Sequence, residues 1–132
     1  MIDEYPYNFY AHYLLANALS QSGNINEAIQ HYTISIKSNP KYPFPKLDLG
    51  LIRINQGKFN EAITILSEAL LIAQKEQMIS MEATIYYGLG TAYANKRDFQ
   101  KAMMFADQAL QRQPQYHDAL LLKQKIQSLS GD

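Results

Sequence analysis

Three short segments of the chain resemble one another and recur at nearly regular intervals. GNINEA covers residues 23–28, GKFNEA covers 57–62 and RDFQKA covers 97–102, so the spacing is first 34 and then 40 residues. Self-similarity at such a period is the signature of a repeat architecture, in which each unit buries its apolar face only against its neighbours. The repeats therefore restrict the fold to an array of small supersecondary units.

The units come into register when they are counted from residues 9, 43 and 83. Apolar residues recur within each unit at helical spacing, which predicts two helices of about 14 residues per unit. Small residues recur where two helices would approach closely. The small residues are Ala16, Gly50 and Gly90 at position 8 and Ala28, Ala62 and Ala102 at position 20, and a large residue recurs at position 7 as Leu15, Leu49 and Leu89.

Turn chemistry marks the ends of the second helix of each unit. We expect these helices to open at Asn26, Asn60 and Gln100, with Asn as a cap in the first two units and Asp98 as a possible substitute in the third. Pro40 and Pro114 cannot continue a helix, so the first and third of these helices are expected to end just before them.

This pattern resembles the tetratricopeptide repeat family over residues 9–116. The third unit carries the family pattern most fully, with Tyr86, Leu89, Gly90, Tyr93, Phe99, Ala102, Ala109 and Pro114, whereas Lys46, Arg53, Gln74 and Arg97 depart from it. The resemblance implies an all-α fold, a right-handed α-solenoid in a single domain over 1–132. The expected repeats span 9–42, 43–82 with six extra residues, and 83–116, followed by a capping helix at 117–130.

The six extra residues fall in LLIAQKEQMISMEA, between Leu70 and Ala83. Because no Pro ends the second helix of unit two, that helix is expected to run on to Lys75 or Gln77, and Ser80 is expected to cap the next one. Two interpretations stay open, a tolerated lengthening of the helices and a functional protrusion, of which the first is favoured.

Composition argues against several classes of function. Twelve basic residues balance twelve acidic ones, so the positive charge typical of proteins that bind nucleic acid is missing. The chain has no Cys, and His12, His31 and His117 lie in different predicted helices without a metal-binding spacing. No Ser carries the flanking glycines of a nucleophile elbow. We therefore expect no enzyme activity, no metal and no cofactor.

The N-terminus, MIDEYPYNFY, has acidic residues where a secretory signal would have basic ones, and no apolar run approaches the roughly 18 residues needed to span a bilayer. A soluble, cytoplasmic chain without direct membrane insertion is the expectation. Pro6 stands 34 residues before Pro40, at the position that would close a preceding unit. This favours a chain cut from, or descended from, a longer array.

In the family that this chain resembles, first-helix residues line a concave groove that receives peptides or helices. Carried over by position, the partner-binding residues would be Tyr10, Tyr13, Asn17, Phe44, Leu47, Asp48, Leu51, Ile54, Asn55, Tyr87, Thr91 and Asn95. Phe44, Leu47, Leu51 and Ile54 form one apolar stripe, which as exposed surface would mark an interaction site. In the alternative interpretation the helix is rotated and this stripe belongs to the core.

The leading hypothesis is a protein-interaction scaffold that binds a short, largely apolar peptide or partner helix in the groove. The alternatives are a self-associating assembly module, a small secretion-type chaperone, and a regulatory part of a larger protein. Family members that bind acidic chaperone tails hold two carboxylates with Lys, Asn and Arg. The corresponding sites here are Tyr13, Asn17, Asp48, Thr84 and Gly88, of which only the Asn matches. We therefore expect such tails not to bind.

Overall fold

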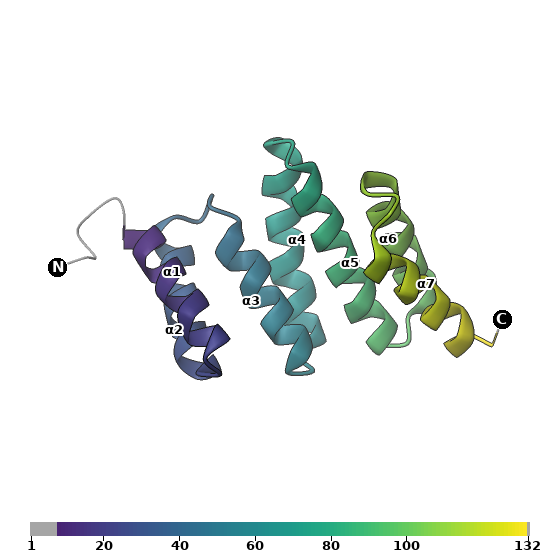
Figure 1. Cartoon of the computed structure of the whole chain (residues 1–132), viewed down its shortest axis with the longest axis horizontal. Coiled ribbons are helices and arrows are strands. Elements are labelled where there is room, and N and C mark those ends of the chain that lie inside the picture. The colour runs from purple at the N-terminus through teal and green to yellow at the C-terminus, as the bar shows by residue number, and fades with distance from the viewer. Residues whose placement is uncertain (1–7, 132) are drawn as a thin grey trace. The chain divides into compact units, whose positions relative to one another are not determined.

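The computed structural model describes residues 8–131, which form seven helices and no strand (Figure 1). The prediction of an all-α fold is confirmed. Pro6 and the first part of the acidic N-terminus lie outside the described residues. The helices are α1 (Asn8–Gln21), α2 (Ile25–Ser38), α3 (Phe44–Asn55), α4 (Phe59–Lys75), α5 (Ile79–Asn95), α6 (Phe99–Arg112) and α7 (His117–Leu129).

The chain divides into two compact units, Met1–Leu49 and Gly50–Asp132. In the N-terminal unit, α1 packs along α2, with Ala16 and Ala28 fully buried between larger side chains. Tyr32 is the largest fully buried side chain of this unit. The hydroxyl of Ser35 donates a hydrogen bond of 2.6 Å to the carbonyl of Phe9, which ties the end of α2 to the start of α1.

Two histidines join the same pair of helices. The His12 ring is buried and stacks on His31, with ring centroids 5.0 Å apart and the two Nδ1 atoms separated by 2.8 Å. That distance is a hydrogen bond in which one ring donates and the other accepts. His12 therefore occupies a packing position between paired helices.

The C-terminal unit builds its core from alanines that face large side chains. Helix α5 packs on α4, α6 and α7, and α6 packs on α7 (Figure 1). Ala102 and Ala106 on α6 are completely buried beside Leu122 and Ile126 of α7. This alternation of small and large residues gives dense packing between helices that approach closely.

Leu66 of α4 fills the space above two glycines. It is fully buried, and a Cβ placed on Gly50 of α3 would lie 2.6 Å from its Cδ2, while a Cβ on Gly88 of α5 would lie 3.1 Å from its Cδ1. A side chain at position 50 would collide with Leu66, which lies against the Gly50 backbone. The small residues at position 8 of the repeats predicted such a close approach of two helices. Gly88 has the same role, although the sequence offered no reason to expect it.

The starts of the second helices differ from the prediction. Helices α2, α4 and α6 begin one residue earlier than expected, at Ile25, Phe59 and Phe99. Asn26 and Asn60 therefore lie in the first turn and do not act as caps. The actual N-cap residues, Asn24 and Lys58, make no capping bond through their side chains.

The third unit does use the substitute cap. Asp98 precedes α6, and its carboxylate accepts a 3.2 Å hydrogen bond from the backbone N–H of Lys101. At the other end, α2 and α6 stop at Ser38 and Arg112, with Asn39 and Gln113 as C-caps, as the following prolines predicted.

The turns between antiparallel helices share one backbone geometry. Gly23 and Gly57 have φ of 88° and 78°, the left-handed region that glycine enters without steric cost. Gln77 and Arg97 occupy the corresponding places in the next two turns, with φ of 56° and 64°. The left-handed backbone conformation costs a non-glycine residue about 1–2 kcal/mol of conformational free energy. Packing of the two helices that each turn connects must therefore offset this cost.

The six-residue expansion lengthens two helices and is packed into the fold. Helix α4 ends at Lys75, within the predicted range, and α5 starts at Ile79 with Met78 as its N-cap, so the prediction of a Ser80 cap was wrong. Ala73 and Met81, within the expansion, are buried.

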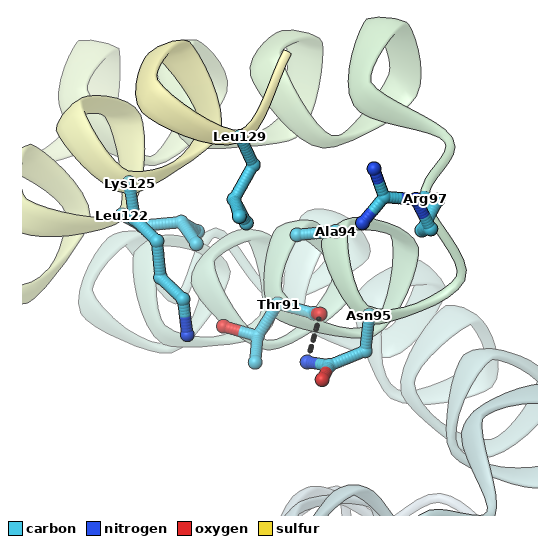
Figure 2. Close-up of a pocket in the computed structure, with 7 residues that line it drawn as sticks. All are labelled: Thr91, Ala94, Asn95, Arg97, Leu122, Lys125 and Leu129. Atoms are coloured by element: carbon cyan, nitrogen blue, oxygen red, sulfur yellow. Dashed lines mark hydrogen bonds between the residues drawn. The ribbon is translucent and has the colours of Figure 1, made fainter. Parts of the chain in front are cut away.

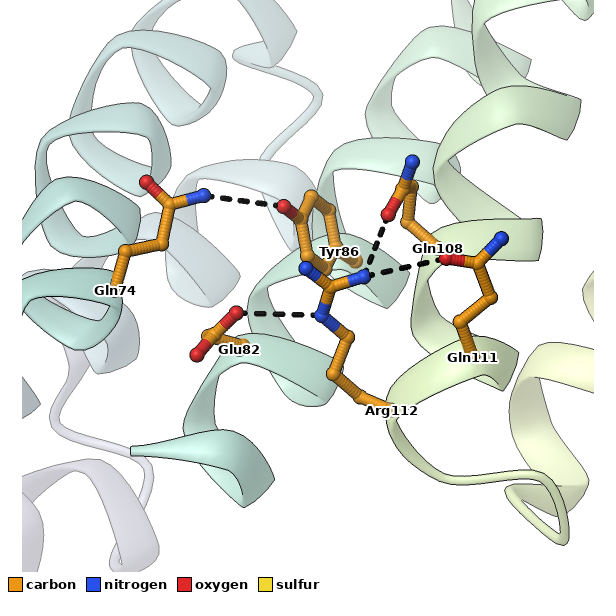
Figure 3. Close-up of polar contacts among 6 residues, drawn as sticks. All are labelled: Gln74, Glu82, Tyr86, Gln108, Gln111 and Arg112. Carbon is orange, nitrogen blue, oxygen red and sulfur yellow. Dashed lines mark hydrogen bonds and ion pairs between the residues drawn. The ribbon is translucent and has the colours of Figure 1, made fainter. Parts of the chain in front are cut away.

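Polar contacts hold the lengthened part of α5 against α6 (Figure 3). Glu82 is 5% exposed, and its Oε1 lies 3.3 Å from Nε of Arg112. The same guanidinium lies 4.9 Å from the ring centroid of Tyr86 and donates a 2.6 Å hydrogen bond to Gln108. Gln74 of α4 donates to the Tyr86 hydroxyl at 3.2 Å. The buried Glu82 carboxylate is thus paired with a guanidinium that Gln108 also binds, and such pairing is the condition for a buried ion pair to be tolerated.

Candidate functional site

None of the twelve residues predicted to line the groove is buried. Tyr10, Asn55 and Asn95 are exposed, and the other nine are half-buried. On α3, the buried residues are Pro45, Lys46, Leu49, Gly50 and Ile52, of which Lys46 is 9% exposed. The stripe of Phe44, Leu47, Leu51 and Ile54 is half-buried.

Aromatic rings cluster on the surface of the N-terminal unit. We call this group the tyrosine cluster, and its members are Tyr10 and Tyr13 of α1, Tyr42 of the following loop and Phe44 of α3. The ring centroid of Tyr42 lies 5.5 Å from that of Tyr13, 5.3 Å from Phe44 and 6.4 Å from Tyr10. These distances are typical of favourable aromatic pairs. Because Tyr10 is 48% exposed, one edge of the cluster faces solvent.

Polar atoms connect the tyrosine cluster to a carboxylate. The Tyr32 hydroxyl donates to Oδ1 of Asn17, Asn17 hydrogen-bonds Tyr13, and the Tyr13 hydroxyl donates to Asp48. Burial raises the pKa of the Asp48 carboxyl above its ordinary value, an effect that the Tyr13 hydrogen bond partly offsets. Burial, followed by the charge of Asp48, raises the pKa of Tyr32. The carboxylate is therefore within electrostatic reach of several ring hydroxyls.

In the C-terminal unit, the apolar stripe continues onto α5. A Cβ on Gly88 would lie 3.4 Å from Cδ2 of Leu51 and 3.8 Å from Cδ1 of Ile54, so both side chains lie against the α5 backbone. Tyr87, one residue before, packs on Tyr116 with centroids 5.4 Å apart. Gly88 itself is buried and is not available to a ligand.

Further along α5, the surface forms a hollow of about 230 Å³ (Figure 2). Thr91 and Asn95 line it, and their mutual hydrogen bond runs from the Asn95 amide to the Thr91 carbonyl at 2.8 Å. Its remaining lining residues are Ala94, Arg97, Leu122, Lys125 and Leu129. Two exposed cations thus stand beside the predicted site residues of this unit.

The pattern that defines tetratricopeptide repeats matches residues 45–115, more than half of the chain, and a second repeat pattern matches residues 9–42. The chain belongs to the tetratricopeptide repeat family. Comparison with curated proteins finds no match.

Several solved structures, tetratricopeptide domains among them, have the same fold. The first such domain of Spaghetti (RPAP3), bound to the HSP90 peptide SRMEEVD, is 18% identical, with a TM-score of 0.84 over 94% of each chain. The Arabidopsis OM64 domain is 21% identical, with a TM-score of 0.81 over 91% of this chain and 94% of its own. BtubC from P. vanneervenii is 20% identical, with a TM-score of 0.86 over 97% of this chain and 59% of its own.

Several residues near the predicted sites were missed by the sequence analysis, yet the repeat register contains a signal for them. Tyr42 and Tyr116 both occupy the last position of a tetratricopeptide repeat, immediately before the next unit begins. Lys125 falls at position 9 when the segment from His117 is counted as a further unit, the position held by Asn17 in the first repeat. Treating α7 only as a cap concealed this correspondence.

Among residues 8–131, no group of three His, Asp or Glu side chains is arranged to hold a metal ion. Over the same described range, no helix has both the length and the apolar character required to cross a bilayer.

Proposed function

We propose that the chain is a protein-interaction scaffold that binds a short, largely apolar peptide or a partner helix through the first-helix residues of its repeats. Tetratricopeptide repeats typically serve as interaction modules without catalytic activity, and the Spaghetti domain binds a peptide. The observation that carries the proposal is the half-buried state of aromatic and aliphatic side chains on α1, α3 and α5.

Half-buried apolar side chains suit such a role because they are positioned by packing and still present area to a partner. Leu51 lies against α5 on one side, and Tyr10 is 48% exposed within the tyrosine cluster. Tyrosines in this setting are enriched at binding hot spots, since they bury a large area at low cost in side-chain entropy.

A phage-displayed library of random peptides, selected against the immobilised chain, tests the proposal. Peptides enriched on the wild type should bind Leu51→Asp at least about tenfold more weakly, because a carboxylate would replace an apolar contact. Tyr10→Ala provides a second variant at a position whose exposure spares the core. Leu71→Asp on α4 is the matched control, since Leu71 is 68% exposed and outside the predicted surface.

Circular dichroism of each variant verifies that the helices are retained. Equal binding by the wild type and by both groove variants would contradict the proposal, and so would a selection that enriches no peptide above background.

A second candidate function, self-association as an assembly module, is supported by a different surface. A hollow of about 550 Å³ between α6 and α7 is lined by apolar side chains that include Phe99, Met103 and Met104, the last of them 48% exposed. Exposed apolar surface of this kind is typical of protein contacts. Light scattering after gel filtration tests it, and a monomer at high concentration would exclude it.

A further inference from the structure

We propose that the tyrosine cluster and Asp48 form a subsite for a Lys or Arg side chain of the bound peptide. This inference rests on the proposed peptide-binding function and specifies the chemistry of the partner. The observation behind it is a half-buried carboxylate that lies among aromatic rings at a surface open on one edge.

The carboxylate is held in place by the fold. Asp48 accepts a hydrogen bond from Tyr13, which is itself hydrogen-bonded to Asn17, and Asn17 accepts one from the buried Tyr32. Side chains from α1 and α2 therefore fix the orientation of an acid on α3. A preorganised acceptor of this kind binds a cation without first losing side-chain freedom.

Among residues 8–131, no salt bridge joins the Asp48 carboxylate to a basic side chain. A carboxylate removed from water is stabilised best by a cation that also donates hydrogen bonds. The partner can supply this cation.

The surrounding rings favour the same type of ligand. The face of an aromatic ring carries negative charge density and attracts ammonium and guanidinium groups. Tyr10, Tyr13, Tyr42 and Phe44 provide four such rings with centroids 5.3–6.5 Å from their neighbours in the cluster. The aliphatic stem of a Lys or Arg would meanwhile cover apolar surface.

Other ligand chemistries fit this surface less well. A carboxylate from the partner would be repelled by Asp48. A wholly apolar side chain would cover the same carboxylate without pairing it, which leaves a desolvated charge in the complex. The subsite therefore discriminates in favour of a cation, while apolar residues of the peptide contact the half-buried aliphatic side chains.

The test uses the peptides enriched from the random library on the wild-type chain. We expect them to share a Lys or Arg at one fixed position beside apolar residues. Replacing that residue by norleucine, which keeps the stem and removes the charge, should weaken binding to the wild type about tenfold, equivalent to about 1.4 kcal/mol. The same peptide change should have little effect on binding to Asp48→Asn.

Two further variants sharpen the test. Asp118→Asn changes the net charge by the same amount at an exposed position of α7, and should bind the cationic peptide as the wild type does. Tyr10→Leu removes one ring and should weaken the cationic peptide by a factor of about 2–5, with less effect on the norleucine peptide.

Enriched peptides without a shared cation, or a cation whose removal costs the same in the wild type and in Asp48→Asn, would overturn the inference and leave the proposed function intact. Failure to enrich any peptide would overturn both.

Discussion

Gly50→Ala tests whether the contact between Leu66 and two glycines limits how closely α3, α4 and α5 pack. The new Cβ would lie 2.6 Å from Cδ2 and 2.7 Å from Cγ of a leucine that is fully buried. Leu66 cannot simply swing away, because its other methyl group already lies close to the backbone of Gly88.

The expected magnitude follows from two opposed effects. Overpacking a well-filled core costs about 1–3 kcal/mol, and the short distance to Cγ places this site in the upper part of that range. The higher helix propensity of alanine over glycine stabilises the folded state by about 1 kcal/mol. We therefore expect Gly50→Ala to lower the free energy of unfolding by about 1–2 kcal/mol, measured by urea denaturation with circular dichroism.

The decisive measurement repeats the substitution in a Leu66→Ala background, where the obstructing side chain is gone. Leu66→Ala alone should cost about 2–5 kcal/mol, but Gly50→Ala should then be neutral or stabilising. Gly57→Ala is the control. It has a φ of 78° and nothing within 4 Å of the added Cβ, so its backbone strain should be the same in both backgrounds. An identical cost of Gly50→Ala in the two backgrounds would refute the reasoning.

Three further outcomes are expected. Glu82→Gln should lower the free energy of unfolding, measured in urea, by about 2 kcal/mol. This loss is below the usual range for breaking a buried ion pair because the Arg112 side chain is 26% exposed. Glu61→Gln is the control: Glu61 is 58% exposed and lies 3.9 Å from Arg53, so its loss should change the free energy of unfolding by less than about 0.5 kcal/mol. Folding raises the pKa of Asp48 above 3.8, so the folded protein favours the protonated carboxyl. The resulting stability is present below pH 3.8 and is lost as the pH rises through the raised pKa. Asp48→Asn should therefore be more stable than the wild type at pH 7, and this difference should vanish in urea titrations below pH 3.8. The peptide SRMEEVD should show no saturable binding in fluorescence anisotropy, because Asp48 repels carboxylates; saturation would contradict the assignment of this surface.

The sequence predicted the features that depend on spacing. The all-α fold follows from apolar residues at helical intervals, and the ends of α2 and α6 follow from Pro40 and Pro114. Gly50 was recognised as a close-approach site because small residues recur at that position of every repeat. These are local or periodic signals, and a single sequence carries them directly.

Contacts between distant parts of a unit left no such signal. Gly88 corresponds by repeat position to a site that binds a carboxylate in other family members, but here Leu66 covers it. No rule of spacing states which side chain of α4 reaches α5. The caps at Asn26 and Asn60 were wrong because a helix can begin without a side-chain cap when packing holds its first turn. The role of Tyr42 depends on four aromatic partners that lie on either side of it in the sequence.

The ion pair between Glu82 and Arg112 has a consequence for how α5 and α6 find their alignment. Rings also stack across the same pair of helices, Tyr86 and Tyr93 of α5 on Phe105 of α6 at centroid distances of 6.0 and 5.5 Å. If one helix slid along the other by a turn, about 5.4 Å, Glu82 would move away from the guanidinium and its buried carboxylate would lose that partner. Together with the stacked rings, the pair thus favours one alignment of the two helices, and it does so within the segment where the repeat is longest.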